Sequence, residues 1–307
     1  MNRGRVTRLL RISRTVSDLA RATAFYRDAL GFRVASDTPL DDAAWAELMG
    51  IPGVQGSAVM LRLGEQELEL VAFSPPGAPY PAESDSTDLW FQHIAIVVSD
   101  IEAAYTKLCG YSFTPISEDG PQRLPPGSGS VTAYKFRDPE GHPLELIQFP
   151  AGTDDPVWQH KEGPFLGIDH SAIDVADIAQ SVEFYARVLG MRVASRSRNA
   201  GPTQQRLDRA REDVVDVVAL QPAGTRVPHL ELLGYRKPVG HPIPRHTKPN
   251  DIAADRLVLQ VEDLTGLVEA LRAKNIAFVS PGVVALASAG KAALIRDPTG
   301  HHLLLCT

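Results

Sequence analysis

Apolar and polar residues along the chain follow two alternating patterns, one typical of strands and one of helices. Runs with strand-like alternation give way four times to stretches with apolar residues three or four positions apart. Each change falls at a Val-x-Asp sequence followed by Leu or Ile, where the aspartate can cap a helix by accepting hydrogen bonds from its first N–H groups. The four aspartates are Asp18, Asp100, Asp177 and Asp263. This recurrence predicts four copies of one small unit.

The first copy indicates how each unit is built. Residues 6–16 have the alternation of a strand, and the helical stretch that begins at Asp18 ends at Leu30, before Gly31. A second strand, a short helix and a hairpin of two strands are expected at residues 33–37, 41–49, 57–63 and 67–72. One unit is therefore expected to contain a strand, a helix and three further strands.

The second half of the chain repeats the first. Asp18 and the turn Asp138-Pro-Glu-Gly-His142 each recur 159 positions later, as Asp177 and Asp297-Pro-Thr-Gly-His301. Agreement at both ends of a half indicates a duplication, in which only loops differ in length. We therefore predict a first module at residues 5–150, a linker at residues 151–164 and a second module at residues 165–307.

The composition limits the kind of protein. The chain has 307 residues, 44% hydrophobic and 22% charged, which is typical of two globular domains. Its net charge of -6 argues against a nucleic-acid or membrane-surface partner, since proteins that bind either usually carry a basic excess. No stretch resembles a signal peptide or a transmembrane helix, and Cys109 and Cys306 form no Cys-x-x-Cys motif. We therefore expect a cytoplasmic protein with reduced thiols.

Chemically active side chains recur at two positions of the unit. Seven residues before the four aspartates lie Arg11, His93, His170 and Arg256. The last strand of each unit contains Leu-x-Leu, and its central residue is, in chain order, Glu69, Glu145, Glu231 and Leu304. A glutamate between two leucines of a strand faces away from them, and its burial costs several kcal/mol unless a positive group meets it. The histidines and glutamates are therefore candidate metal ligands. Three other histidines follow turns and are expected to be structural: His142, His301 and His302.

Read together, four motifs resemble the vicinal oxygen chelate superfamily. They are His followed seven residues later by Asp, Phe-Tyr-x-x-x-Leu-Gly, Leu-Glu-Leu and Asp-Pro-x-Gly-His, and they cover nearly the whole chain. The superfamily includes lactoylglutathione lyase (glyoxalase), methylmalonyl-CoA epimerase, extradiol ring-cleaving dioxygenases and the fosfomycin and bleomycin resistance proteins. The resemblance implies an α+β fold of tandem paired βαβββ units, four units in two modules, that form curled mixed β-sheets with flanking helices.

The resemblance also implies how the metal ligands assemble, because they come from the first and last strands of the units. Dioxygenase-like sites take two histidines and a glutamate from one module, and neither module here supplies that triad. Glyoxalase-like sites cross between modules, which here gives a complete set: His93, Glu145, His170 and Glu231. The remaining positions are expected to form a degenerate second site, in which two arginines flank a glutamate: Arg11, Glu69, Arg256 and Leu304. The alternative is that one of these arginines holds an anionic substrate.

A glyoxalase-like site implies a lyase or isomerase that acts on a small substrate chelating one divalent metal ion through neighbouring oxygens. Nickel, zinc, cobalt, manganese and iron(II) remain candidates for that ion. Glu145 is the expected catalytic base, with Glu231 as its catalytic counterpart across the metal. An iron(II)-dependent ring-cleaving dioxygenase and a ligand-sequestering resistance-type protein are the alternatives. The chain is expected to act as a monomer of two modules or as a homodimer.

Three residues are candidate substrate contacts. His229 shares a strand face with Glu231, because side chains two apart in a strand point to the same side. Arg236 and Lys237 belong to a basic, proline-containing stretch at residues 234–252. That stretch is either a solvated loop or a basic lid over an anionic substrate.

Overall fold

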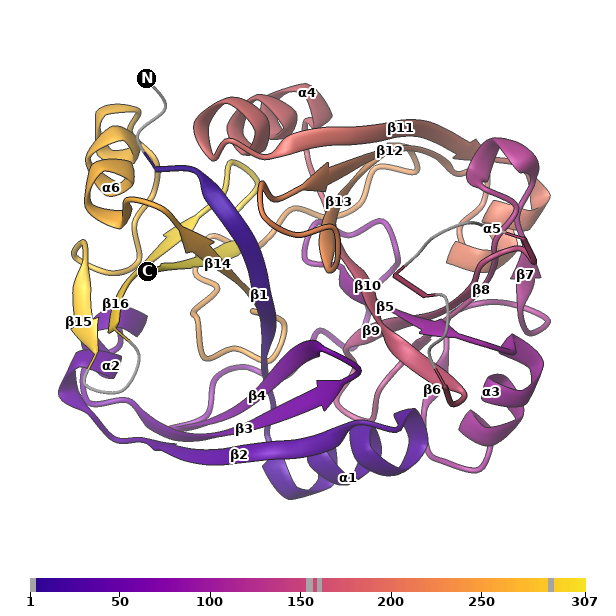
Figure 1. The fold of residues 1–307 in the computed structure, drawn as a ribbon, viewed down its shortest axis with the longest axis horizontal. Helices are drawn as coiled ribbons and strands as arrows, with labels where there is room; N and C mark the ends of the chain where they lie inside the picture. The colour runs from indigo at the N-terminus through magenta and orange to yellow at the C-terminus, as the bar shows by residue number, and fades with distance from the viewer. Residues whose placement is uncertain (1–3, 153–156, 159–161, 287–289) are drawn as a thin grey trace.

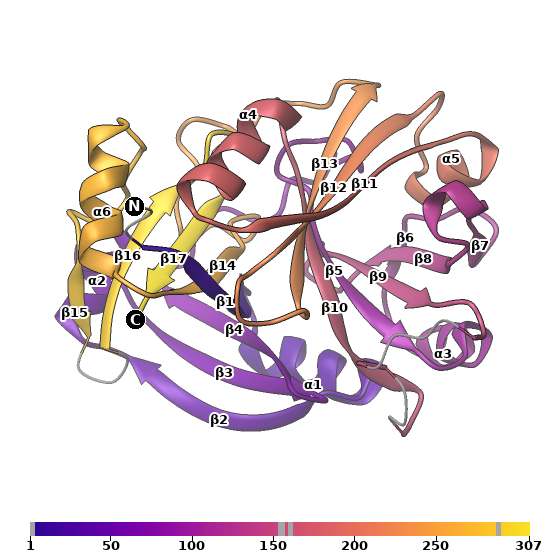
Figure 2. The same ribbon diagram turned by 45° about the horizontal axis from the view of Figure 1, so that its top comes forward.

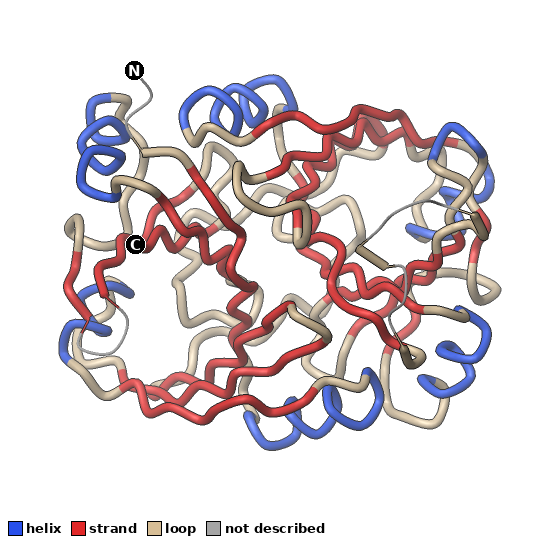
Figure 3. The backbone as a smooth tube through the Cα atoms, in the orientation of Figure 1, coloured by secondary structure: helices blue, strands red, loops and turns tan. Residues whose placement is uncertain are grey.

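The computed structural model describes residues 4–152, 157–158, 162–286 and 290–307. Its strands form two curled sheets, and the helices α1, α3, α4 and α6 lie at the periphery (Figure 1, Figure 3). The helices of the first half are α1 (Leu19–Leu30), α2 (Ala43–Met49) and α3 (Ile101–Leu108). Those of the second half are α4 (Ile178–Val182), which continues as the π-helical turn η2 (Glu183–Val188), α5 (Pro202–Asp208) and α6 (Leu264–Ala273).

The first sheet is built from the two ends of the chain. Its strands lie in the order β15-β16-β17-β14-β1-β4-β3-β2, so the first unit pairs with the fourth (Figure 2). The first unit supplies β1 (Val6–Thr15), β2 (Arg33–Leu40), β3 (Gln55–Leu63) and β4 (Gln66–Ser74). The fourth unit supplies β14 (Arg256–Val261), β15 (Val284–Leu286), β16 (Gly290–Arg296) and β17 (His302–Cys306).

The second sheet is built from the two middle units, in the order β11-β12-β13-β10-β5-β9-β8-β6. The second unit supplies β5 (Gln92–Val98), β6 (Thr114–Pro115), β7 (Gln122–Arg123), the short 3-10 turn η1 (Pro126–Ser128), β8 (Thr132–Arg137) and β9 (Pro143–Gln148). The third unit supplies β10 (Phe165–Asp174), β11 (Arg192–Ala200), β12 (Val214–Gln221) and β13 (His229–Lys237). Each sheet therefore combines one unit from each half of the chain. The division into modules at residues 151–164 stays a prediction.

The repeated aspartates cap the helices as predicted. Asp18 accepts a hydrogen bond from the Arg21 N–H, and Asp100, Asp177 and Asp263 make equivalent bonds at the starts of α3, α4 and α6. Gly31 ends α1 in the left-handed conformation, with a φ of 75°, which glycine adopts without strain. None of the helices among the described residues is long and apolar enough to cross a membrane.

One hydrophobic cluster joins the outer faces of both sheets to the peripheral helices. Because strand side chains alternate, each central strand gives one face to this cluster and keeps the other for the concave side of its sheet. In β5, Ile94 and Ile96 belong to the cluster, whereas His93 and Ala95 face the opposite side. The alternation therefore leaves the concave side of the second sheet available for polar chemistry.

The stretch at residues 234–252 is only partly a loop. Residues 234–237 continue β13, where Tyr235 pairs with Val215 and Lys237 with Val214 on β12. The prediction of a loop from residue 234 was wrong at this end, because pairing with β12 extends the strand past Gly234.

Candidate metal centre

The two predicted histidines lie on adjacent strands from different halves of the chain. His93 is on β5 and His170 on β10, and these antiparallel strands form the centre of the second sheet. Ala172 pairs with His93 and Ala95 with His170, so the two histidines are two pairs apart along the ladder and share one face of the sheet. Their ring centroids are 5.6 Å apart. Strand pairing between units thus joins histidines that are remote in sequence.

The two predicted glutamates flank this pair of strands. Glu145 is on β9, which lies parallel to β5, and Glu231 is on β13, which lies parallel to β10. The leucines on either side of each glutamate belong to the large hydrophobic cluster, so both carboxylates face the histidines. Glu145 is 6% exposed, which means that its charge is removed from bulk water.

The side chains of His93, Glu145 and His170 converge on one point, and Glu231 lies beside His170. Glu145 Oε2 lies 3.2 Å from His93 Nε2 and 3.7 Å from His170 Nε2. Glu231 Oε2 lies 3.6 Å from His170 Nε2. One ligand atom each from His93, Glu145 and His170 lies within 4.8 Å of the others, a spacing that could hold a metal ion. The structure thus brings together all four residues that the sequence predicted as ligands.

Asp169 fixes the orientation of His170 and was not predicted from the sequence. Its Oδ2 lies 2.9 Å from His170 Nδ1, so the imidazole turns its Nε2 toward the two glutamates. Neighbouring residues of a regular strand point to opposite faces. Here a register shift between Ile168 and His170 breaks that alternation and brings Asp169 to the side of its neighbour.

His229 lies beside the four predicted ligands. It pairs with His170 across the parallel strands β10 and β13, and its Nε2 is 3.5 Å from Glu231 Oε1. Its Nδ1 is 3.9 Å from Asp169 Oδ2. Asp169, His170 and His229 form a second set of closely spaced potential ligands. His229 therefore lies next to the ligand cluster, as its strand position predicts.

Burial and neighbouring charges set the protonation of the candidate ligands. Burial lowers the pKa of His93, and the nearby Lys135 ammonium lowers it further, which favours the neutral imidazole that binds metals. Burial also acts to lower the pKa of His170, but the carboxylates of Glu231, Asp169 and Glu145 outweigh it and raise the value to about 9.

Both glutamates are ionised at neutral pH. Burial acts to raise the pKa of Glu145, yet His93, Lys135 and His170 hold it below its usual range. The charge of His170 likewise overcomes burial and lowers the pKa of Glu231 to about 2. Two anionic carboxylates beside two imidazoles are a donor set suited to a divalent cation.

A cavity of about 530 Å³ opens from the cluster, and His93, Glu145, His170, Glu231 and His229 line it. This volume lies in the range of small-molecule sites. Its other walls combine apolar residues with a polar group that the sequence did not reveal. The apolar residues include Leu124, Val131, Ile147, Phe149, Val215 and Leu233, and the polar group includes Lys135, Gln204 and Tyr235.

The other two predicted substrate contacts lie outside this lining. Arg236 is exposed near the end of β13, and its Nε donates to Asp216 Oδ2 at 2.6 Å. Lys237 is also exposed, at the last position of the strand. Neither residue is among those that line the cavity. A role in binding substrate stays a prediction for both.

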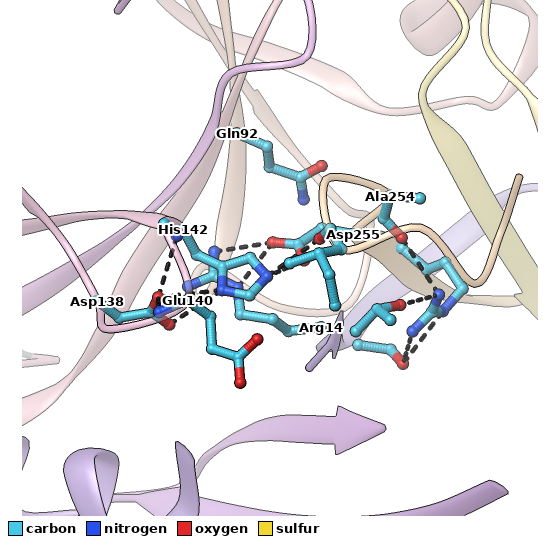
Figure 4. Close-up of polar contacts among 12 residues, drawn as sticks. Arg14, Gln92, Asp138, Glu140, His142, Ala254 and Asp255 are labelled. Atoms are coloured by element: carbon cyan, nitrogen blue, oxygen red, sulfur yellow. Dashed lines mark hydrogen bonds and ion pairs between the residues drawn. The ribbon is translucent and has the colours of Figure 1, made fainter. Parts of the chain in front are cut away.

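His142 belongs to a separate buried polar network, as expected for a structural histidine. Figure 4 shows it between Asp138 and Asp255. Its Nδ1 lies 3.0 Å from Asp138 Oδ2, and its Nε2 lies 3.1 Å from the carbonyl oxygen of Ile252. The fully buried Arg14 donates through Nε to Asp255 Oδ2 at 2.8 Å. This network links the first, second and fourth units and so ties the two sheets together.

The equivalent positions of the first sheet form no such cluster. Arg11 Nε donates to Glu69 Oε1 at 3.2 Å, as predicted. Arg256 lies on the other side of β1, where its charge also interacts with Glu69, as expected for two arginines that flank this carboxylate. Its hydrogen bonds go instead to Ser13 Oγ, Thr15 Oγ1 and two carbonyl oxygens. It makes no hydrogen bond to Glu69 within the described part of the chain, because these oxygens already satisfy it.

Comparison with known proteins agrees with this architecture. The sequence profile of the Glyoxalase/Bleomycin resistance protein/Dioxygenase superfamily matches residues 8–146 and again residues 167–305. The chain belongs to this superfamily. Within it, glyoxalase I from Zea mays has a similar structure, with a TM-score of 0.63 over 99% of this chain and 92% of the maize chain. The two sequences are 18% identical, so the likeness shows the shared fold alone.

Two superfamily members of known activity are similar in sequence. Lactoylglutathione lyase from Arabidopsis thaliana is 24% identical over 186 residues, which are 61% of this chain and 56% of the lyase. The 2-epi-5-epi-valiolone epimerase from an Actinomyces species is 32% identical over 149 residues, 46% of this chain and 79% of the epimerase. The match thus spans little more than half of the lyase. One relative is a lyase and the other an epimerase.

Proposed function

We propose that this glyoxalase-superfamily protein is a divalent-metal-dependent lyase or isomerase for a small substrate with two neighbouring oxygens. The observation that carries the proposal is the convergence of His93, Glu145, His170 and Glu231 at the wall of one cavity. The lyase and epimerase among its relatives support this class of reaction and leave the substrate open.

The ligand residues fit a divalent cation. Nδ1 of His93 is buried without a hydrogen-bond partner in the described part of the chain, and its buried Nε2 meets Glu145 Oε2 at 3.2 Å without the geometry of a hydrogen bond. Buried polar atoms are nearly always paired, so an unpaired buried imidazole needs an explanation, which a bound cation supplies. Loss of the His170 proton on metal binding would leave two neutral imidazoles and two carboxylates, which would balance the charge of a divalent ion and leave room for two substrate oxygens.

Glu145 is the residue that we assign to proton transfer. A divalent ion held here would polarise the substrate oxygens and stabilise the negative charge that develops when a neighbouring carbon loses a proton. The ionised carboxylate of Glu145 can accept that proton, and Glu231 offers a second carboxylate on the other side of His170. Apolar residues such as Ile147 and Phe149 keep water away from the reacting carbon.

The test is exchange of a carbon-bound proton. Metal-free protein is reconstituted with nickel, cobalt, zinc, manganese or iron(II), and hydroxyacetone in deuterated water is followed by NMR. We expect deuterium to enter the carbon next to the carbonyl with at least one ion, and a chelator to stop the exchange. A complete lack of exchange with every ion, for hydroxyacetone and for the adduct of methylglyoxal with glutathione, would overturn the proposal.

A further inference from the structure

A buried polar network lines the cavity next to the metal ligands. Lys135 Nζ donates to Asp208 Oδ1 at 2.6 Å. The other oxygen of this carboxylate accepts from Tyr235 Oη at 2.7 Å and from Gln204 Nε2 at 2.6 Å. Lys135, Gln204 and Tyr235 all line the cavity, and the side chains of the ion pair are 5% and 0% exposed. The network is therefore both desolvated and in reach of a ligand.

Strand pairing places this network beside the proposed base. Lys135 on β8 is the direct partner of Glu145 on β9, and paired strands lie about 4.8 Å apart. The ammonium of Lys135 and the carboxylate of Glu145 thus project from neighbouring strands on the same face of the sheet. A substrate that reaches Glu145 also meets Lys135.

The duplicated first sheet shows what the fold does at these positions without a ligand site. The internal repeat places Leu294 where Lys135 stands, since Leu294 pairs with Leu304 as Lys135 pairs with Glu145. The whole network has apolar counterparts. In the order Lys135, Asp208, Gln204 and Tyr235, they are Leu294, Met49, Trp45 and Phe73.

All four counterparts belong to one hydrophobic cluster, which also contains Leu304. The fold therefore packs well with apolar side chains at every position of the network. Replacing a buried ion pair with apolar residues is often neutral or stabilising. Folding stability gives no reason for the polar set in the second sheet, and its place in the cavity points to a ligand.

The free donors and acceptors of the network define the chemistry of that ligand. Asp208 is the only hydrogen-bond partner of the Lys135 ammonium in the described part of the chain, so two of its three N–H groups are available. The amide of Gln204 is oriented by donation to Asp208, and its Oε1 is buried without a partner among the described residues, where an acceptor needs one. Lys135, bound to one oxygen of Asp208, thus offers a hydrogen-bond donor to a ligand. Gln204, bound to the other oxygen, offers an acceptor.

A hydroxyl group matches this pair, because it can accept from Lys135 and donate to Gln204. A carboxylate would match the ammonium alone and would be repelled by Gln204 Oε1. It would also add a third negative charge beside Asp208 and Glu145, whereas the charge of Lys135 is already balanced by Asp208. The network therefore favours a neutral hydroxyl over an anionic group.

We infer that Lys135 and Gln204 form a hydroxyl-binding subsite, and that the substrate is a small polyhydroxylated hydroxyketone with a hydroxyl beyond its two chelating oxygens. This inference rests on the proposed function, since the subsite adjoins the metal ligands. The cavity of about 530 Å³ accommodates a molecule of this size.

The test compares the binding of two ligands to manganese-loaded protein by titration calorimetry. Erythrulose carries hydroxyls beyond its chelating pair, and hydroxyacetone carries none. We expect erythrulose to bind at least about tenfold more tightly, because a buried hydrogen bond to a charged donor adds about that factor.

The double variant Lys135→Leu with Asp208→Met copies the first sheet, and Gln204→Leu removes the free acceptor. Both should bind the two ligands about equally while keeping the metal and the fold.

Arg62→Gln, which breaks an exposed ion pair with Glu67 on the first sheet, is the control and should keep the preference for erythrulose. Equal binding of the two ligands to the unaltered protein, or a preference that survives in both subsite variants, would overturn the subsite. Failure of both ligands to bind would also overturn the subsite. A preference without any proton exchange would defeat the proposed function and leave the subsite standing. Proton exchange without a preference for erythrulose would overturn the subsite and leave the proposed function standing.

Discussion

His93 and His170 form a T-shaped contact, with their rings 5.6 Å apart and inclined by 71°. They belong to the second and third units, on opposite sides of residues 151–164, and both direct Nε2 toward Glu145. An ion held between them would be bound by both halves of the chain. Metal binding should therefore depend on the pairing of β5 with β10.

Substitution of either histidine tests this arrangement. His93→Ala and His170→Ala should each lower metal affinity by at least about 100-fold, because each removes one of the two imidazoles that approach Glu145. The check is metal content per chain after dialysis against a weak chelator. His142→Ala and the exposed His241→Ala are controls that should keep the metal. Full retention by the His170 variant would rule out the assignment.

Glu145→Gln separates metal binding from proton transfer. A carboxamide can still offer an oxygen to the ion, but it does not accept a proton at neutral pH. We expect proton exchange to slow by about 100-fold or more while most of the metal remains bound. Metal content and exchange rate are measured on the same sample. Unchanged exchange would transfer the role of base to another residue, with Glu231→Gln as the next variant to measure.

The sequence predicted the fold, and it indicated the candidate ligands, for physical reasons. Each helix needs a cap, so the aspartates at Asp18, Asp100, Asp177 and Asp263 mark the same point of every unit. A strand exposes alternate residues to one face, so a glutamate between two core leucines has to face the concave side. These local rules indicate the candidate ligands, and the family resemblance implies how the candidates combine across the modules.

Other features depend on contacts that no local pattern encodes. Asp169 meets His170 because of a register shift in β10, which the sequence does not reveal. Lys135 and Asp208 lie 73 positions apart and belong to different units, so their ion pair depends on how α5 packs over the second sheet. Arg236 was a candidate substrate contact because of its charge, yet it pairs with Asp216. Charge alone does not reveal which way a side chain points.

The buried carboxyl of Asp174 should make the folded protein less stable as the pH rises. This carboxyl is fully buried, and neither of its oxygens has a hydrogen-bond partner among the described residues. Burial raises its pKa well above the usual value, with Asp208 and Asp88 adding to the effect and Lys135 opposing it. Because the folded-state pKa exceeds that of the unfolded chain, the protonated group favours folding below about pH 4, and this contribution is lost as the pH rises.

Asp174→Asn removes this titration and keeps the shape of the side chain. At about pH 8 the variant should be more stable than the unaltered protein by over about 1 kcal/mol, and the difference should shrink toward pH 4, since one unit of pKa corresponds to about 1.4 kcal/mol. Urea unfolding at several pH values measures it. Parallel pH profiles for the two proteins would show that Asp174 is not held protonated.

The first sheet predicts the number of metal ions bound per chain. At the positions that correspond to the two histidines it has Arg11, paired with Glu69, and Arg256, held by four oxygens. Leu304 replaces the fourth ligand and packs in the same hydrophobic cluster as Trp45 of α2. We therefore expect one ion per chain.

Leu304→Glu should add no second ion, because two guanidinium groups repel a cation. The variant should also lower the stability of the fold by a few kcal/mol, because it buries a charge. Metal analysis and urea unfolding measure both effects, and two tightly bound ions in the unaltered protein would contradict the prediction.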